Sequence, residues 1–473
     1  MSSGNWSPGE VKERAGLFNR FLSLANSRIK GTKKGIVGIP VKADWGPDGE
    51  IVVCNDAADI TTTFGEGGTV YLAVRAAKGG KEYKPYRIIV YRMAAASASQ
   101  AVATVGETIK LVTKYKGTRG NSFKVSISSN IVDEAKKDIC IYENNVVMQK
   151  YTVEPTDIDA AVNAINNDSG SLVSAIKLKE GALADVSGQA FSGGDSGSEV
   201  TTKEYVNALA AFEAAYINTL ALDGVTDEAI LTVAKSWHNR VWEAGKMVQL
   251  CIGGTHDDDK DPKVGNARSR ACNHYGIINS IVGGIDSAGN RYSSAEMAAQ
   301  FAGAISALPL NSSLTYKELE DIVDVTVRLT GTEIGVATTA GSLTLFKDID
   351  PETFEATIRV ERGINTFTTF SSEKGEKLRK IKAISTMAAI DYDTGKYAMK
   401  SVIGQLDNDG DGQATLISGI KAYLETLVTS HVISSDILVV LSESLKTEGD
   451  IVYLETQALT IDKIEQIFNK IYL

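Results

Sequence analysis

The spacing of hydrophobic residues divides the chain into regions of different structural type. In residues 123–128 every second side chain is apolar, which places the apolar side chains on one face of a β-strand. Apolar runs at 139–142 and 146–153 predict neighbouring strands. A turn-rich Gly/Ser segment at 192–198 closes this region. We therefore predict an inserted β-rich domain over 96–195.

The apolar spacing becomes helical after residue 200. Apolar side chains from Tyr205 to Phe212 recur at helical intervals, and Thr201 and Glu204 have the spacing of a capping box. Alternating helices and buried strands form a mostly parallel sheet with helices on both faces, so we predict a central α/β domain over 196–350. The further elements expected here are strands at 219–222, 247–252 and 277–282 and helices at 227–242 and 294–308.

The flanking regions are mixed. Residues 31–95 contain short apolar runs separated by Gly and Asp turns, which predicts strands with few helices. Residues 351–473 mix strand and helix patterns and are predicted to be α+β. Within them, 450–473 is expected to form a C-terminal arm. Its beginning, 451–454, is typical of a strand, whereas its later apolar residues have helical spacing: Ile464, Ile467, Phe468 and Ile471.

Residues 1–30 contain too few apolar groups for a core of their own. They are rich in Ser, Asn and Gly, with spaced apolar side chains that include Val11, Leu17, Phe18 and Phe21. Such an arm can be ordered by adding as a strand to another sheet. It can equally be an edge strand of its own domain.

Composition narrows the possible functions. With 473 residues, about three domains are expected. A formal net charge of -10 argues against nucleic acid as the main partner, because phosphate binding needs concentrated Lys and Arg. No stretch has the eighteen or so apolar residues of a membrane-spanning helix and no signal-peptide pattern is present, so we expect no membrane insertion. The four cysteines lack metal-site or disulfide spacing.

Two patterns imitate catalytic or cation-binding motifs. Gly194–Gly197 matches the serine motif of trypsin-like proteases, with Ser196 as the nucleophile. It lies in a Gly/Ser linker, and no histidine of the chain has a setting that suggests a triad. The acidic run 256–261 follows a predicted buried strand and is typical of a polar loop. An α/β enzyme of unknown substrate remains an alternative function.

A third pattern resembles half of a calcium loop. Asp407, Asp409 and Asp411 stand at alternate positions with Gly412 after them, but Ser418 replaces the glutamate that such a loop needs at position twelve. The simpler explanation is an acidic turn before a helix. A calcium-stabilised surface-array protein is a second alternative function.

Several segments together resemble the contractile phage tail sheath family. Their order and spacing are specific, although no single motif is. The likeness is closest in character to sheaths of Gram-positive defective prophages and of R-type phage-tail-like bacteriocins such as diffocins. The segments that carry the resemblance are 7–18, 35–46, 56–65, 191–212, 294–315, 363–366, 382–390 and 407–417.

The resemblance implies a structural protein without a cofactor rather than an enzyme. It implies a subtilisin-like sheath core, with 96–195 as an outward decoration and 382–390 as one of the C-terminal strands. Subunits would form a helical homo-oligomer around an inner tail tube protein, bounded by baseplate and tail terminator proteins. The N- and C-terminal arms would add strands to neighbouring subunits, and contraction would drive the tube through a cell envelope. Assembly would occur in the host cytoplasm, and lysis would release the particle.

Overall fold

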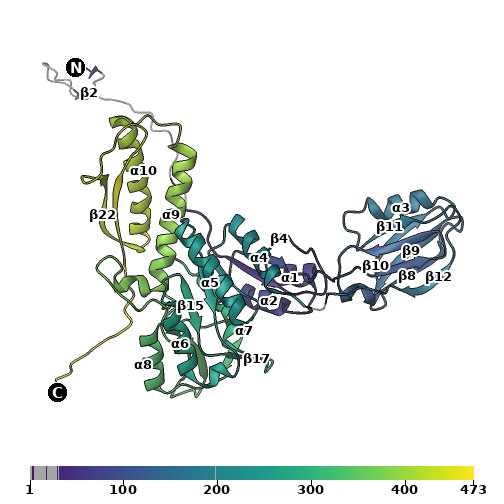
Figure 1. Cartoon of the computed structure of the whole chain (residues 1–473), viewed down its shortest axis with the longest axis horizontal. Coiled ribbons are helices and arrows are strands. Elements are labelled where there is room, and N and C mark those ends of the chain that lie inside the picture. Colours follow the sequence, from purple (N-terminus) through teal and green to yellow (C-terminus); the bar gives the residue numbers. More distant parts are fainter. Residues whose placement is uncertain (1–2, 5–16, 19–28, 30, 198, 473) are drawn as a thin grey trace. The chain divides into compact units, whose positions relative to one another are not determined.

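The structure is a computed structural model that describes residues 3–4, 17–18, 29, 31–197 and 199–472. The chain divides into two compact units (Figure 1). The larger unit comprises Lys33–Ala388 with Lys463–Leu473, and the smaller comprises Met1–Thr32 with Ala389–Asp462. Among the described residues, no helix has the length and apolar character needed to cross a membrane.

A seven-stranded sheet forms the centre of the larger unit, with strand order β19-β15-β14-β13-β3-β5-β4. All neighbouring strands are parallel except β4, which runs antiparallel to β5 at the edge. The predicted mostly parallel sheet is thus confirmed. The sequence did not show that strands before residue 95 would join it. The strands are β3 (Ile36–Val41), β4 (Ile51–Cys54), β5 (Arg87–Arg92), β13 (Thr219–Ala221), β14 (Gln249–Ile252), β15 (Ile277–Ser280) and β19 (Ser342–Leu343).

Helices cover both faces of this sheet. One face, with Ile39 and Val90, packs against Phe301 of α7 in one apolar core, and the opposite face, with Tyr91, packs against Phe212 of α4 in another. The expected capping box at the start of α4 is present. The helices are α1 (Ala57–Phe64), α2 (Val70–Lys78), α4 (Thr202–Ala214), α5 (Glu228–Glu243), α6 (Pro262–Cys272), α7 (Ser294–Ala307) and α8 (Gly331–Ala340), with a 3₁₀ turn at Asp258–Lys260.

Helices α1 and α2 correct the expectation of few helices between residues 31 and 95. Asp56 caps α1 by accepting a hydrogen bond from the backbone N–H of Asp59. Five residues of α2 are buried, which stabilises a helix whose length alone would be marginal. Packing rather than local pattern therefore determines these two helices.

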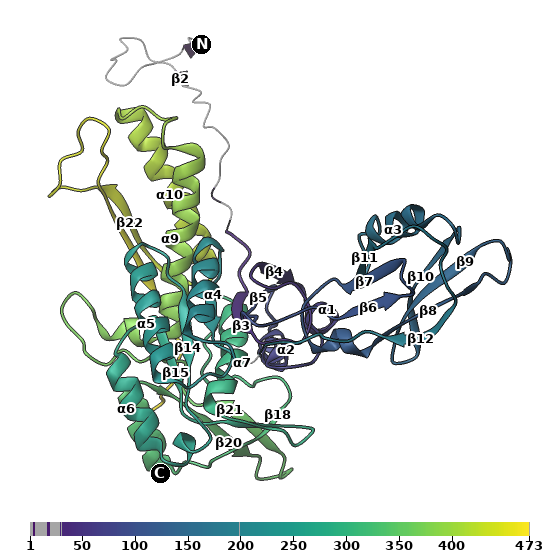
Figure 2. The same ribbon diagram turned by 45° about the vertical axis from the view of Figure 1, so that its right-hand side comes forward.

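The insert between β5 and α4 has its own core between two sheets (Figure 2). The four-stranded sheet has the order β10-β9-β8-β12 and the three-stranded sheet the order β11-β7-β6. Phe123, Val125 and Ile127 are buried on one face of β8, as their alternation predicts. The elements are β6 (Val102–Val105), β7 (Ile109–Thr113), β8 (Phe123–Ser129), β9 (Lys137–Glu143), β10 (Val146–Val153), α3 (Ile158–Asn166), β11 (Val173–Lys177), β12 (Val186–Ala190) and a 3₁₀ turn at Thr118–Ser122.

Two small sheets complete the larger unit. A three-stranded sheet has the order β17-β16-β18, and a hairpin pairs β20 with β21. The elements are β16 (Gly284–Asp286), β17 (Arg291–Tyr292), β18 (Ile322–Val325), β20 (Leu345–Ile349), β21 (Ala356–Val360) and a 3₁₀ turn at Glu376–Arg379.

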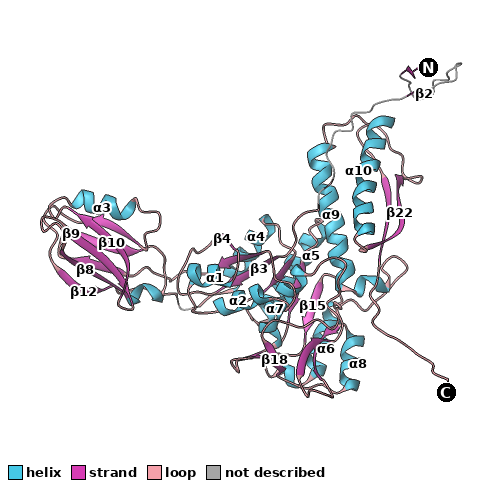
Figure 3. Cartoon of the chain, turned by 180° about the vertical axis from the view of Figure 1, so that it is seen from behind, coloured by secondary structure: helices cyan, strands magenta, loops and turns pink. Residues whose placement is uncertain are grey.

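The smaller unit consists of helices and a β-hairpin (Figure 3). Two residues at each of β1 and β2 pair in parallel near the N-terminus. Helix α9 begins in the larger unit and continues into the smaller one. The elements are β1 (Ser3–Gly4), β2 (Leu17–Phe18), α9 (Ile381–Ser401), α10 (Gly410–Thr429), β22 (Ile433–Leu441) and β23 (Leu454–Thr460).

Two predictions for the C-terminal region are corrected. Residues 382–390, expected as a strand, lie inside α9, since this alanine-rich segment contains strong helix formers. The helical spacing near the end of the chain does not produce a helix. Residues 454–460 form a strand, and 461–472 have no regular structure, because no neighbouring surface covers the apolar face that a short helix would need.

Candidate assembly site

The hairpin β22–β23 has unpaired edges. The two strands are antiparallel, from Ile433 opposite Thr460 to Leu441 opposite Leu454. Within the described ranges the sheet contains only these two strands, so the outer edge of each carries backbone groups that no further strand pairs. The turn of chain after α10 leads directly into β22, and Tyr423, Leu424 and Leu427 of α10 are buried. This sheet can accept an additional strand at either edge.

The apolar residues of the C-terminal segment are uncovered. Ile464, Ile467, Phe468 and Ile471 have between 73% and 92% of their surface exposed. Such a row of large apolar side chains is typical of a segment that binds a partner. Of the predicted N-terminal arm residues, Leu17 and Phe18 form β2, whereas Val11 and Phe21 lie outside the described residues.

The acidic turn at 407–412 forms the start of α10. The Asp409 carboxylate accepts a hydrogen bond from the backbone N–H of Gly412, at 2.8 Å, and so caps the helix. The Asp411 carbonyl accepts from the Thr415 hydroxyl within the same first turn. In the part of the chain that the structure describes, no group of three or more His, Cys, Asp or Glu side chains is arranged to hold a metal ion.

The protease-like motif lies at the junction where the insert returns to the central sheet. The Ser196 hydroxyl accepts a hydrogen bond from the backbone N–H of Thr118, and the Asp195 carboxylate accepts from the N–H of Gly197. Asp195 also pairs with Ser99 through the backbone. Across the described residues no hydrogen bond joins Ser196 to a histidine, and these contacts position a chain connection.

The acidic loop 256–261 supports the first turn of α7. The Asp259 carboxylate accepts hydrogen bonds from the backbone N–H and the hydroxyl of Ser294. Burial raises the pKa of Asp259 to about 6, against the effect of those hydrogen bonds. Asp258 forms an ion pair with Arg268, and Asp261 caps α6. Each of these three aspartates therefore stabilises a structural element.

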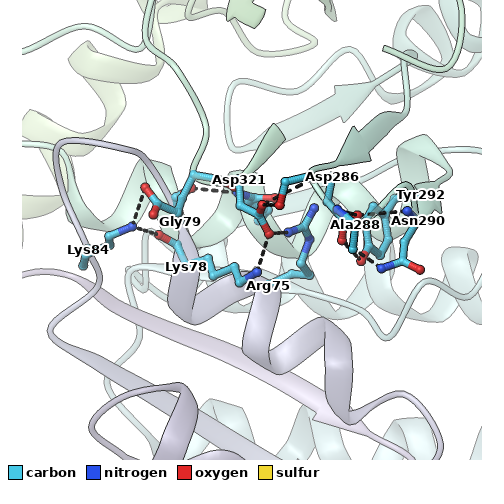
Figure 4. Close-up of polar contacts among 12 residues, drawn as sticks. Arg75, Lys78, Gly79, Lys84, Asp286, Ala288, Asn290, Tyr292 and Asp321 are labelled. Atoms are coloured by element: carbon cyan, nitrogen blue, oxygen red, sulfur yellow. Dashed lines mark hydrogen bonds and ion pairs between the residues drawn. The ribbon is translucent and has the colours of Figure 1, made fainter. Parts of the chain in front are cut away.

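A second polar network joins α2 to the small sheet around β16 (Figure 4). Arg75 and Lys78 of α2 both contact the carboxylate of Asp321, and the Arg75 guanidinium lies 4.2 Å from the centre of the Tyr292 ring. Burial opposes ionisation of Asp321, but hydrogen bonds from Lys78 and Ser287 outweigh it and lower its pKa to about 2. The network fixes these elements to each other, with the Asp321 carboxylate shared by two cations.

Three models of phage tail sheath domains match successive parts of the chain. The "Phage tail sheath protein beta-sandwich domain" matches residues 94–196, the "Phage tail sheath protein central domain" matches 198–366, and the "Phage tail sheath C-terminal domain" matches 373–473. The chain is 26% identical over 446 residues to the phage-like element PBSX protein XkdK of Bacillus subtilis, covering 91% of this chain and 89% of that protein. A tail sheath protein of a Clostridium phage is 27% identical over 35% of this chain and 43% of its own length.

Solved structures show the same fold. The sheath tail protein of Desulfitobacterium hafniense has a TM-score of 0.72 at 24% identity, covering 94% of this chain and all of that one. The helical sheath of the anti-feeding prophage in its contracted state has a TM-score of 0.57 at 11% identity, covering 98% and 99%.

The fold, the two-stranded hairpin and the uncovered chain end are features expected of a subunit of a larger assembly. The family matches make that class specific: the chain belongs to the phage tail sheath family. It is a structural subunit of a contractile sheath, a component of a phage tail or tail-like particle.

Proposed function

We propose that this subunit polymerises helically around an inner tail tube and contracts to drive the tube through a target cell envelope. The observation that carries the proposal is the combination of a two-stranded hairpin with unpaired edges and a chain end whose apolar residues are exposed. A strand from a neighbouring subunit would satisfy the edge, and the neighbour's sheet would cover the exposed side chains.

Exchange of arms also explains how a sleeve could lengthen without closing. A contact in which one subunit gives an arm and the next receives it is heterologous, and repetition of such a contact produces a helical filament. The predicted arm residues are Val11, Leu17, Phe18 and Phe21 at the N-terminus and Ile464, Ile467, Phe468 and Ile471 at the C-terminus.

Contraction in this proposal is a rearrangement of folded subunits. The closely packed larger unit would rotate as a rigid body while exchanged strands stay paired and act as hinges. The free energy would come from an extended lattice that is metastable with respect to a contracted one.

The domain limits in this proposal are the predicted ones: 1–30, 31–95, 96–195, 196–350 and 351–473.

The partners in this proposal are identical subunits, the inner tail tube, the baseplate and a tail terminator. Subunits would assemble in the host cytoplasm and leave with the particle on lysis. A chain in the baseplate structure of the anti-feeding prophage is similar to this chain at 12% identity. The TM-score of 0.51 indicates that the two chains share a fold, which supports a sheath that meets a baseplate.

The test is electron microscopy of the purified protein at high concentration, alone and with its candidate tube protein. We expect full-length chains to form striated sleeves and chains lacking residues 1–20 to stay folded by circular dichroism without forming them. Ile131→Ser, at an exposed loop of the insert, is the matched control and should assemble normally. Normal sleeves from the truncated chain would overturn the arm mechanism, and persistent full-length monomers in both conditions would contradict sheath assembly.

A further inference from the structure

One residue of the C-terminal segment differs from its neighbours in burial. The side chain of Glu465 is 9% exposed, whereas Ile464 and Phe468 on either side are 84% and 92% exposed. A carboxylate is an unusual group to bury in a segment whose apolar residues face solvent, because burial of a charge is costly unless the charge is paired. The contacts of Glu465 therefore need an explanation of their own.

The Glu465 carboxylate lies in a site built from three side chains of the larger unit. One oxygen accepts from the Thr315 hydroxyl at 2.7 Å. The other accepts from Arg362 through Nε at 3.1 Å and Nη2 at 2.7 Å, and it also contacts the ammonium group of Lys380. Both oxygens thus have donors, and two positive charges face one negative charge.

The Thr315 hydroxyl is held in position for this role. It accepts hydrogen bonds from the backbone N–H of Gly363 at 2.9 Å and from the Ser313 hydroxyl at 3.0 Å. Its two acceptor positions are then used, so its single proton points to Glu465. A hydroxyl fixed in this way, together with two cations, forms a preorganised carboxylate site.

The electrostatics of the site favour the ionised form of Glu465. Burial alone would raise the pKa of the carboxyl, but the hydrogen bonds from Lys380, Arg362 and Thr315 outweigh burial and lower it. Removing one partner of such a buried pair leaves the other charge uncompensated. The site therefore binds Glu465 in its ionised form at neutral pH.

The position of Glu465 along the chain gives the site its role. Only four residues separate Glu465 from Thr460, the last residue of β23, and the exposed apolar residues Ile467, Phe468 and Ile471 all follow it. Thr315, Arg362, Lys380 and Glu465 all belong to the larger unit, so the site forms within one compact part of the chain. The segment that can reach a partner thus starts at a fixed point.

We propose that Thr315, Arg362 and Lys380 form an anchor for Glu465 of the same chain, which fixes the root of the C-terminal arm and leaves residues 466–472 to bind a second copy. This inference rests on the proposed arm exchange. Fixing the root lowers the conformational entropy that the arm loses when it binds, so Glu465 is a positioning residue for assembly.

Trypsin cleavage of the unassembled protein tests the anchor directly. Lys463 lies two residues before Glu465, within the anchored segment, and Lys470 lies beyond it. Because proteolysis follows local opening, we expect Glu465→Gln to accelerate cleavage after Lys463 by roughly tenfold. Cleavage after Lys470 should not change and serves as the internal control.

Further variants separate the anchor from general effects on folding. Thr315→Val keeps the side-chain shape but removes the hydroxyl, and it should also accelerate cleavage after Lys463, whereas Thr315→Ser should behave like the unchanged protein. Glu180→Gln removes a carboxylate of an exposed ion pair in the insert and should have no effect. Equal acceleration of cleavage after Lys463 and after Lys470 would indicate that the whole C-terminal segment is less ordered, and it would overturn the anchor.

Assembly gives the second readout. We expect Glu465→Gln to raise the protein concentration needed for sleeves by about tenfold, since the arm loses its fixed root. Unchanged protection of Lys463 and unchanged assembly in Glu465→Gln would overturn the anchor while leaving arm exchange intact. Normal sleeves from a chain lacking residues 466–473 would instead overturn arm exchange, and the Lys463 measurement on monomers would still decide whether the anchor exists.

Discussion

The central sheet of the larger unit and the hairpin of the smaller unit differ in how deeply their strands are buried. In the central sheet, β13, β14 and β15 are buried at every position, with helices on both faces. In the hairpin, β22 has only two buried residues among nine and β23 has none. Both sheets end in strands that pair on one side only, but helices of the same chain cover the faces of the central sheet, whereas most side chains of the hairpin stay uncovered. In the proposed sheath, stability and assembly would therefore depend on different parts of one subunit.

The sharpest test of this difference is the same substitution in a helix of each unit. A methyl group added at Gly303 of α7 would lie 1.9 Å from the backbone oxygen of Ala76, whereas one at Gly395 of α9 would meet nothing within 4 Å. Gly303→Ala should lower the free energy of unfolding by about 3 kcal/mol because α7 and α2 must move apart. Gly395→Ala should raise it by up to about 1 kcal/mol. Thermal and urea denaturation measure the free energy of unfolding of both variants. Equal changes in the two variants would contradict the difference in packing between the two helices.

The stability of the larger unit should also depend on acid through His238. This side chain is fully buried, its Nε2 lies 2.9 Å from the Val248 carbonyl oxygen, and burial lowers its pKa to about 4. The unfolded chain binds a proton below about pH 6.5 and the folded chain does not until about pH 4, so stability falls as pH falls through this range. His238→Gln should remove about 3 kcal/mol of that fall. Denaturation curves from pH 7 to pH 4 measure it.

Asp259 provides a control of opposite sign for the acid prediction. Its pKa is raised to about 6, so the folded chain binds a proton before the unfolded chain does and gains stability as pH falls from 6 toward 4. Asp259→Asn should therefore make the loss in acid steeper, whereas His238→Gln makes it shallower. Identical pH profiles for the two variants would show that neither group titrates as described.

A smaller effect is expected at the start of α10. Asp409→Ala removes the cap on Gly412 and should cost about 1 kcal/mol, while Asp409→Asn should stay close to the original value because asparagine also caps helices. Melting temperatures with calcium and with a chelator should be equal. A clear rise with calcium that depends on Asp409 would favour a metal site over the helix cap.

Local sequence signals predicted those elements whose causes are local. The alternation from Phe123 to Ile127 and the capping box at Thr201 and Glu204 both produced the expected structure. Helices α1 and α2 and the entry of β3 and β5 into the central sheet depend on packing with residues far along the chain. Nothing near Glu465 in the sequence distinguishes it, because Thr315, Arg362 and Lys380 meet it only in the folded chain.

The smallest expected effect on stability is at Phe468, in the exposed C-terminal segment outside both sheets. Its side chain is 92% exposed, so Phe468→Asp should change the free energy of unfolding of the monomer by less than about 0.5 kcal/mol. The same change should abolish sleeves in electron microscopy, because an aspartate would have to be buried against a neighbouring subunit. Val132→Asp, at a 95% exposed apolar position of the insert, adds the same charge and is the control. If Phe468→Asp destabilises the monomer or leaves assembly unchanged, the exposed chain end does not serve a second copy.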